Sequence, residues 1–427
     1  MTLLWIALAA YALLAWKDLR TAFFLFIAFL PAYLIRLQIS GLPTTALEVM
    51  FAILFVAWML KREKRLIDIK GWGWLMLAWL IVATVSMFVS PDFRAAAGVW
   101  KAYFVEPILF FLIANDLMRT QADRVGALKA LAWSAIAVGA SAVVQHWTNW
   151  GVPPPFNGQP IPPATEAEFR STSFYGFPNA IGLFLSPLVP LFITMAFAHA
   201  PTRKEQVLSR WLFAFAALFS MAGILFAQSE GAIVGVAAGL AFLALMTERT
   251  RLPALLGGSI LGIVLLAIPV TRATLIEKVT LADWSGRVRT QMWGETWNML
   301  KEHAVFGAGL SGYPIVFDKY HLARYIEIFQ YPHDILLDFW VETGLAGVIV
   351  FALLIWRYMT SLRAVSRRDP RLHAWTVMLA GSMIALLVHG LVDVPYFKND
   401  LAMLLWLLLA LASSTLAEAR RNKNAPT

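Results

Sequence analysis

The chain has 427 residues, of which 59% are hydrophobic and 14% are charged. A water-soluble protein of this length could not bury so much apolar surface, so the composition predicts a polytopic membrane protein. The net charge of +9 would suggest nucleic acid as a partner for a soluble chain, but here the basic residues lie mostly in short connections between apolar runs, and we expect no nucleic acid partner. With no cysteine in the sequence, disulfides, thiolate nucleophiles and thiolate metal sites are excluded.

The apolar runs predict an all-α membrane protein with about 12–13 transmembrane helices in the lipid bilayer. The first run lacks a basic start and a small-residue cleavage site, so we expect no cleavable signal peptide. The predicted spans are about 2–16, 21–36, 44–60, 72–90, 95–117, 125–147, 177–199, 209–228, 231–247, 253–271, 334–357, 373–392 and 400–418.

Lys and Arg concentrate in alternate connections between these runs. Because cytoplasmic loops are enriched in Lys and Arg, we place these connections and the C-terminus in the cytoplasm. The two longest connections, 148–176 and 272–332, then lie together on the extracytoplasmic face and can build one site. The basic residues that decide this topology are Lys61, Arg62, Lys64, Arg65, Lys70, Arg119, Arg124, Arg203, Lys204, Arg210, Arg249, Arg251, Arg357, Arg363, Arg367, Arg368, Arg371, Arg420, Arg421 and Lys423.

This topology divides the chain into five parts. The second loop is too long for a plain connector, which indicates a functional segment. Within it, apolar residues at helical spacing predict an amphipathic helix over 285–303. The five parts are N-terminal transmembrane helices (1–147), a first extracytoplasmic loop rich in proline (148–176), central transmembrane helices (177–271), a large extracytoplasmic catalytic loop (272–332), and C-terminal transmembrane helices with a basic cytoplasmic tail (333–427).

The stretch 331–347 ends the second loop and begins a strongly apolar helix. Pro332 suits a first helical turn, where the missing N–H has no partner in any case. His333 follows directly, and the partial positive charge of a helix N-terminus favours its neutral form. A neutral imidazole can accept a proton, so His333 is a candidate general base, with a purely structural histidine as the alternative.

Three carboxylates follow at intervals of four residues: Asp334, Asp338 and Glu342. This spacing places them on one face of the predicted helix. Carboxylates at the mouth of a membrane helix are costly unless they face water, protein or substrate. Asp334 and Glu342 are therefore candidates for orienting the imidazole of His333.

Arg170, Arg287 and Arg289 lie on the same predicted face as His333. A guanidinium is always charged, and its donors fit phosphate oxygens, so these arginines are candidates for binding an anion. The alternative for each is an arginine that reaches toward lipid headgroups. Near the end of the chain, Asp393 and Lys398 belong to a predicted solvated turn that could also line the site.

Several common signatures of metal and nucleotide chemistry are missing. The sequence contains no H-E-x-x-H, no G-x-x-x-x-G-K-[ST], no G-x-S-x-G and no D-x-D pattern. We therefore expect no metal and no cofactor, and chemistry on a sugar phosphate would rely on arginines.

Four stretches together carry a family resemblance. Residues 333–347 fit H-[ND]-x-x-L-x-x-x-x-E-x-G-x-x-G, and RVRTQMW followed by HAVFGAGLSGY supplies Arg289 and Trp293. FRSTSFYGFPNA supplies Arg170 and Asn179, and QSEGAIVG is the fourth stretch. In this order they resemble the O-antigen ligase and O-antigen polymerase superfamily of bacterial membrane glycosyltransferases, mainly over residues 165–350.

The sequence departs from this family at one position. In the QSEGAIVG stretch, Glu230 stands where the family has an arginine. The substitution removes one expected phosphate-binding charge. Among the site residues, Glu230 is therefore the one at which substrate binding is expected to differ.

The resemblance implies a multi-pass enzyme of the bacterial inner membrane that acts in lipopolysaccharide or other cell-surface polysaccharide biosynthesis. It implies metal-independent, inverting transfer of a glycan from an undecaprenyl-pyrophosphate donor to a glycan, lipid or protein hydroxyl, with the active site on the extracytoplasmic face. His333, Arg289, Glu342 and Asp334 are then catalytic candidates. The substrate-binding candidates are Arg170, Arg287, Asn179, Glu230 and Lys398.

Three alternatives to a ligase are considered. A polymerase would use the same donor and extend the lipid-linked glycan. A transporter would bind the same lipid without chemistry, but the sequence lacks the repeated halves and broken midplane helices typical of many transporters. A non-catalytic partner in envelope assembly is suggested only by Glu230.

Overall fold

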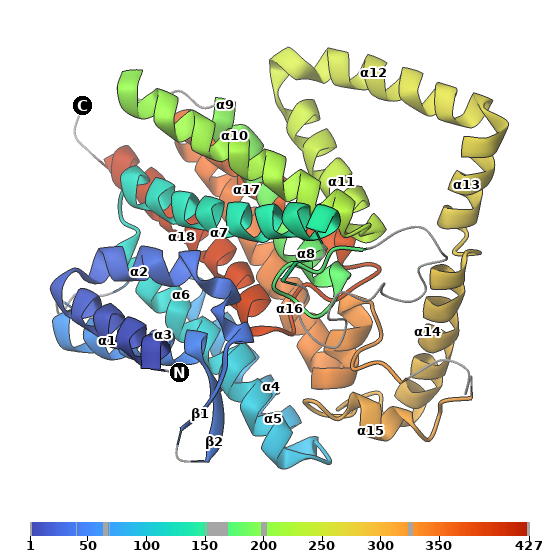
Figure 1. The fold of residues 1–427 in the computed structure, drawn as a ribbon, viewed down its shortest axis with the longest axis horizontal. Coiled ribbons are helices and arrows are strands. Elements are labelled where there is room, and N and C mark those ends of the chain that lie inside the picture. Colours follow the sequence, from blue (N-terminus) through green and yellow to red (C-terminus); the bar gives the residue numbers. More distant parts are fainter. Residues whose placement is uncertain are drawn as a thin grey trace.

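The structure is a computed structural model that describes residues 2–39, 41–62, 67, 69–148, 150–151, 170–197, 203–322 and 328–424. These residues are almost entirely helical, apart from one short antiparallel hairpin, which confirms the predicted all-α class (Figure 1). Most of the proline-rich part of the first predicted loop lies outside the described residues.

The elements follow one another along the chain as α1 (Thr2–Lys17), α2 (Leu19–Ala28), η1 (Leu30–Leu34), β1 (Arg36–Ile39), β2 (Leu42–Thr45), α3 (Ala46–Lys61), α4 (Gly73–Val89), α5 (Phe93–Val99), η2 (Trp100–Val105), α6 (Glu106–Leu117), α7 (Gln121–Thr148), α8 (Pro178–Leu185), α9 (Leu188–Phe197), α10 (Arg203–Phe226), α11 (Glu230–Met246), α12 (Glu248–Ala267), α13 (Pro269–Val279), α14 (Trp284–Glu302), α15 (Tyr313–Phe317), α16 (Ile335–Arg368), η3 (Pro370–Leu372), α17 (His373–His389) and α18 (Asn399–Asn424).

The membrane-spanning character of the fold is also confirmed. Within the described part of the chain, seven helical segments are long and apolar enough to cross a membrane, and the bent pair α8–α9 makes an eighth. Four shorter apolar helices, α1, α2, α4 and α11, accompany them. The larger number predicted from the sequence arises because hydropathy counts each short apolar helix as a separate crossing.

Helix α18 lies at the centre of the packing (Figure 1). Of its most apolar 18-residue window, 94% is buried, and the helix packs against α6, α16 and α17. Trp406 of α18 meets Phe111 of α6 edge to face, with ring centroids 5.6 Å apart. A central helix of this kind fixes the positions of both its ends, and its first residues follow the loop that contributes to the candidate site.

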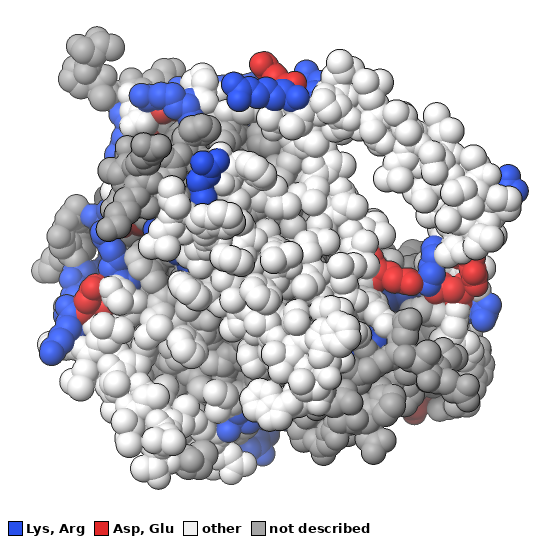
Figure 2. Space-filling view, turned by 45° about the horizontal axis from the view of Figure 1, so that its top comes forward, with Lys and Arg blue, Asp and Glu red and all other residues white. Residues whose placement is uncertain are grey.

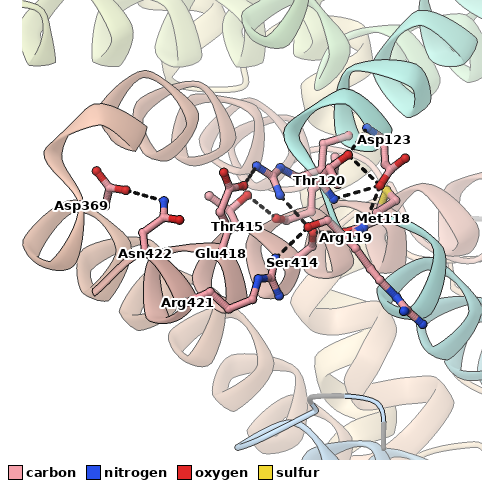
Figure 3. Close-up of polar contacts among 12 residues, drawn as sticks. Met118, Arg119, Thr120, Asp123, Asp369, Ser414, Thr415, Glu418, Arg421 and Asn422 are labelled. Atoms are coloured by element: carbon pink, nitrogen blue, oxygen red, sulfur yellow. Dashed lines mark hydrogen bonds and ion pairs between the residues drawn. The ribbon is translucent and has the colours of Figure 1, made fainter. Parts of the chain in front are cut away.

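The C-terminal half of α18 is held by a polar network (Figure 3). Arg124 of α7 is fully buried and pairs with Glu418, while its Nη1 donates to Ser414 Oγ over 3.3 Å. Arg421 donates to the carbonyl of Arg119 over 2.7 Å. Since buried charges are retained only when paired, this network is a structural joint between α18 and the start of α7.

The α12–α13 arm behaves differently. Neither helix has a buried residue, and in Figure 1 the two run around the outside of the molecule toward α14. Figure 2 shows an opening between this arm and the rest of the protein, with acidic and basic residues gathered beside it. The arm therefore connects α11 with α14 while making few contacts of its own.

The predicted helix over 285–303 is confirmed as α14. Together with α15 and the start of α16, it forms a small hydrophobic cluster of its own. Gly344, with φ of 69°, breaks the helical geometry of α16, and an added Cβ would lie 2.2 Å from the carbonyl oxygen of Val305. Glycine is required here because only it adopts this φ freely and permits the close approach of two backbones. The contact fixes the segment after α14 against α16.

Candidate functional site

His333 forms a pair with a buried carboxylate. Its Nδ1 lies 3.2 Å from Oδ1 of Asp393, whose side chain is 2% exposed, while the histidine side chain is 17% exposed. Burial alone would raise the pKa of Asp393, but the charge and hydrogen bond of His333 hold that pKa well below its usual range. An ionised Asp393 can accept a hydrogen bond from Nδ1–H, and in that tautomer of the uncharged ring Nε2 carries the free lone pair.

The local backbone differs from the prediction around His333. Helix α16 begins at Ile335, and Asp334 is its N-cap, accepting from the backbone N–H groups of Leu336 and Leu337 over 2.9 and 2.8 Å. Pro332 and His333 therefore precede the helix instead of forming its first turn. His333 has a φ of 51°, which is strained for a non-glycine residue and typical of functional positions.

The other carboxylates of α16 also serve purposes different from those expected. Glu342 accepts from the backbone N–H of Ser311 over 2.6 Å, and Asp334 is occupied as the cap. Asp338 and Glu342 are buried, so this helix face meets protein and not water. The carboxylate that orients the imidazole is Asp393 instead of Asp334 or Glu342, and the predicted solvated turn around Asp393 is wrong because the loop is packed between helices.

Helix α14 makes one hydrogen bond to the residue before Asp393 and one to the residue before His333. Arg289 donates from Nε to the carbonyl of Val392 over 3.0 Å, next to Asp393, and from Nη1 to Oγ of Ser285 over 2.7 Å. Trp293 donates from Nε1 to the carbonyl of Pro332 over 2.7 Å, next to His333. The helix therefore holds the chain on both sides of the imidazole–carboxylate pair and places a guanidinium beside it.

Arg170 is fixed by neutral oxygen atoms. Its Nε donates to the carbonyl of Ala227 over 2.9 Å, and one terminal nitrogen donates to Oδ1 of Asn179 over 2.8 Å. Burial lowers the pKa of Arg170, as does the positive charge of Arg289, while Glu230 acts in the opposite direction. Arg170 is thus within electrostatic reach of both Arg289 and Glu230, as the sequence predicts for a shared site.

Glu230 forms an ion pair that the sequence does not reveal. Lys278, in the last turn of α13, places Nζ 2.7 Å from Oε1 of Glu230 and 2.8 Å from Oδ2 of Asp283. Asp283 is also the N-cap of α14. The bridge joins the start of α11, the end of α13 and the start of α14, which are far apart in sequence.

The last two predicted residues occupy less central positions. Arg287 is exposed and donates to the carbonyl of Ala282, at the start of its own helix. Lys398 lies at the end of the loop that contains Asp393. Burial lowers the pKa of Lys398, opposed by the charges of Asp400 and Asp393. In the part of the chain that the structure describes, no three His, Asp or Glu side chains are arranged to hold a metal ion.

Sequence reasoning missed the roles of Asp393 and Lys278. Asp393 is separated from His333 by 60 residues, and only its place at the end of an apolar run hinted at a role. Lys278 carries no motif. Both roles depend on the contacts between distant helices.

Comparison with known protein families gives one match. The model of the family described as O-antigen ligase matches residues 215–352. The match covers 138 of the 427 residues and supports a place in the O-antigen ligase and polymerase superfamily. The matched segment contains Glu230, Lys278, Arg289 and His333, whereas Asp393 lies beyond it. The comparison with curated proteins finds no match.

The match supports the resemblance read from the sequence. It indicates an O-antigen ligase or polymerase type of membrane enzyme in polysaccharide biosynthesis. The same match also implies a lipid-linked glycan substrate and a protein that crosses a bacterial membrane several times.

Proposed function

We propose that the protein transfers a glycan from an undecaprenyl-pyrophosphate donor to an acceptor hydroxyl on the extracytoplasmic side of the inner membrane. Its C-terminus lies in the cytoplasm, as the distribution of basic residues indicates. One observation carries the proposal: Arg170 and Arg289 are each held by neutral oxygen atoms, and among the described residues neither has a carboxylate within ion-pair distance. Two positioned but unneutralised guanidinium groups, one of them bonded to the residue before Asp393, suit a diphosphate leaving group.

His333 is the general base in this reaction. The acceptor hydroxyl loses its proton to Nε2 of His333, and its oxygen forms a bond to the anomeric carbon from the face opposite the diphosphate. The bond from that carbon to the bridging oxygen breaks, and its electron pair leaves on the diphosphate, which inverts the anomeric centre. Asp393 keeps the proton on Nδ1 and stabilises the imidazolium that forms.

Arg289 and Arg170 act on the departing group. Negative charge grows on the diphosphate as the glycosidic bond breaks, so fixed guanidinium groups stabilise the transition state more than the ground state. Arg289 is aligned by Val392 and Ser285, and Arg170 by Ala227 and Asn179, so little reorganisation is needed during the reaction. The site residues themselves provide the charge stabilisation in this proposal, without a metal ion.

A ligase and a polymerase of this kind differ in the acceptor that receives the glycan. A ligase transfers the glycan to a lipid core or a protein hydroxyl, and a polymerase transfers it to another lipid-linked glycan. The buried His333–Asp393 pair favours chemistry over transport, because a transporter would need the basic cluster alone. In this proposal Lys398, at the end of the loop that contains Asp393, contacts the sugars or the acceptor.

The test is turnover by purified protein supplied with a lipid-linked oligosaccharide and, in parallel, with each class of acceptor. We expect release of undecaprenyl pyrophosphate together with a product of inverted anomeric configuration, and loss of both in His333→Ala. Movement of the lipid across proteoliposomes without release of undecaprenyl pyrophosphate would instead identify a transporter. Full turnover by purified His333→Ala would exclude His333 as the base.

A further inference from the structure

Lys278 connects three helices at the edge of the candidate site. Its ammonium group is 2.7 and 2.9 Å from the two carboxylate oxygens of Glu230 and 2.8 Å from Asp283. The side chain of Glu230 is 62% exposed, that of Lys278 is 40% exposed, and that of Asp283 is 16% exposed. Among these three, Glu230 is the partner that water can most readily replace.

The two acidic partners are not equivalent. Asp283 accepts the backbone N–H of Gly286 over 3.1 Å as the cap of α14, so it has a structural function apart from Lys278. Glu230 begins α11 and makes no hydrogen bond to the helix end, so Lys278 is the partner that fixes its carboxylate. Losing Glu230 would therefore leave the helix ends unchanged and free one side of the ammonium group.

The position of Glu230 relative to the arginines matters most. Its negative charge acts on Arg170, on which Arg289 also acts, so the carboxylate lies in the field of one of the cations that would hold a diphosphate. Arg289 also acts on Asp283. A carboxylate that pairs with Lys278 and acts on Arg170 occupies the kind of position that an anionic ligand would take.

We propose that Lys278 is a ligand for the diphosphate of the donor, and that Glu230 holds its ammonium group until the donor arrives. This inference rests on the proposed function. When the diphosphate enters, the ammonium exchanges the carboxylate of Glu230 for a phosphate oxygen and keeps Asp283. The exchange is between two ion pairs at a partly exposed site, so it is reversible. It explains how the site accommodates an acidic residue at position 230.

The proposal predicts the direction in which each substitution changes anion binding. If Lys278 binds the ligand and Glu230 competes with it, then Lys278→Gln weakens binding and Glu230→Gln strengthens it. If the pair were only a structural clamp, both substitutions would break the same contact and change binding in the same direction. The two explanations are therefore separable with variants of similar size.

The experiment measures inorganic pyrophosphate binding to the purified full-length protein by titration calorimetry at constant ionic strength. Compared with the wild type, we expect the dissociation constant to be about three- to tenfold larger for Lys278→Gln and about two- to fivefold smaller for Glu230→Gln. One partly solvated charge is worth about 1 kcal/mol, which sets this range. The matched controls are Lys319→Gln and Glu302→Gln, which break another exposed Lys–Glu pair, with an N–O distance of 3.2 Å. We expect no change in either control.

Shifts of the same sign in Lys278→Gln and Glu230→Gln would overturn the proposal in favour of a clamp. Unchanged binding in Lys278→Gln, or no binding of pyrophosphate by the wild-type protein, would also overturn it. The proposed function is tested separately, because turnover of lipid-linked donor by wild-type protein and its loss in His333→Ala do not depend on Lys278. A protein with normal turnover and no effect at Lys278 would retain the proposed function without this inference.

Discussion

Arginines at two regions of the molecule have opposite surroundings. At the joint between α7 and α18, Arg124 is fully buried, pairs with Glu418 and lies over the ring of Trp375 at 5.0 Å. At the candidate site, Arg289 and Arg170 are partly exposed and bond only to uncharged oxygen atoms among the described residues.

This difference in hydrogen-bond partners distinguishes an arginine that stabilises the fold from one whose charge is available to a ligand. An arginine neutralised by a carboxylate contributes to folding and has little remaining attraction for an anion. An arginine aligned by carbonyl and amide oxygens keeps its positive charge while its orientation is fixed. The same residue type is therefore a joint in one region and a binding group in the other, and the predictions below test this contrast.

The largest expected effect is at His333. His333→Ala should lower turnover by about 10²–10⁴, because general-base assistance is worth that much. The thermal unfolding midpoint should also fall, because the buried carboxylate of Asp393 loses its partner, so turnover is compared per folded molecule. Turnover of purified lipid-linked donor measures the first quantity and intrinsic fluorescence the second. A variant that unfolds without losing specific activity would make the histidine structural.

Arg124 should show the reverse pattern. Arg124→Met leaves Glu418 without its partner in a largely buried position, which should cost about 3 kcal/mol of unfolding free energy. The fraction that remains folded should keep its turnover. The measurement combines urea unfolding with specific activity per folded molecule, and reduced catalysis without reduced stability would contradict the contrast between the two regions.

Arg289 should affect catalysis with little effect on stability. Removing a donor that stabilises developing charge lowers turnover by about 10²–10³, so we expect that loss for Arg289→Ala. Arg289→Lys should recover part of it, because lysine keeps the charge but lacks the planar arrangement of donors. Equal turnover of both variants and the wild type would remove Arg289 from the site.

Asp393→Asn should have a smaller effect, of about 10–100-fold on turnover, comparable to losing a carboxylate that orients an imidazole. The pKa of Asp393 is lowered in the folded protein, so its contribution to stability is complete above the unfolded value near pH 3.9 and is lost only at lower pH. The difference in unfolding midpoint between the wild type and Asp393→Asn should therefore be constant from pH 5 to 8. A difference that disappears within this range would show that Asp393 titrates there.

The smallest effect is expected at Ser285. Ser285→Ala removes the hydroxyl that accepts from Nη1 of Arg289, while the bond from Nε to Val392 remains. One hydrogen bond to a charged group is worth about 1.5–3 kcal/mol when buried, and less at this exposed end of α14, so turnover should fall by less than about tenfold. A loss as large as that of Arg289→Ala would mean that Ser285 contacts the substrate itself.

The amino-acid sequence by itself determined the fold class and the membrane setting, and it indicated the family resemblance. Long apolar runs have few structural alternatives in a bilayer, because every backbone polar group must be satisfied within a helix. The spacing of apolar residues over 285–303 was likewise enough to predict α14. The short motifs around His333 and Arg289 were enough to indicate a resemblance that the family match over residues 215–352 supports, since they are local in the chain.

Only the tertiary structure decided which groups meet. Asp334 had the right spacing to orient His333. The first turn of α16 needs an N-cap, however, and Asp334 accepts hydrogen bonds from the free backbone N–H groups there. The partner of His333 is Asp393, and that of Glu230 is Lys278, 48 residues away. These contacts depend on how helices pack across the whole chain, and a sequence pattern reports only which residues share a face of one helix.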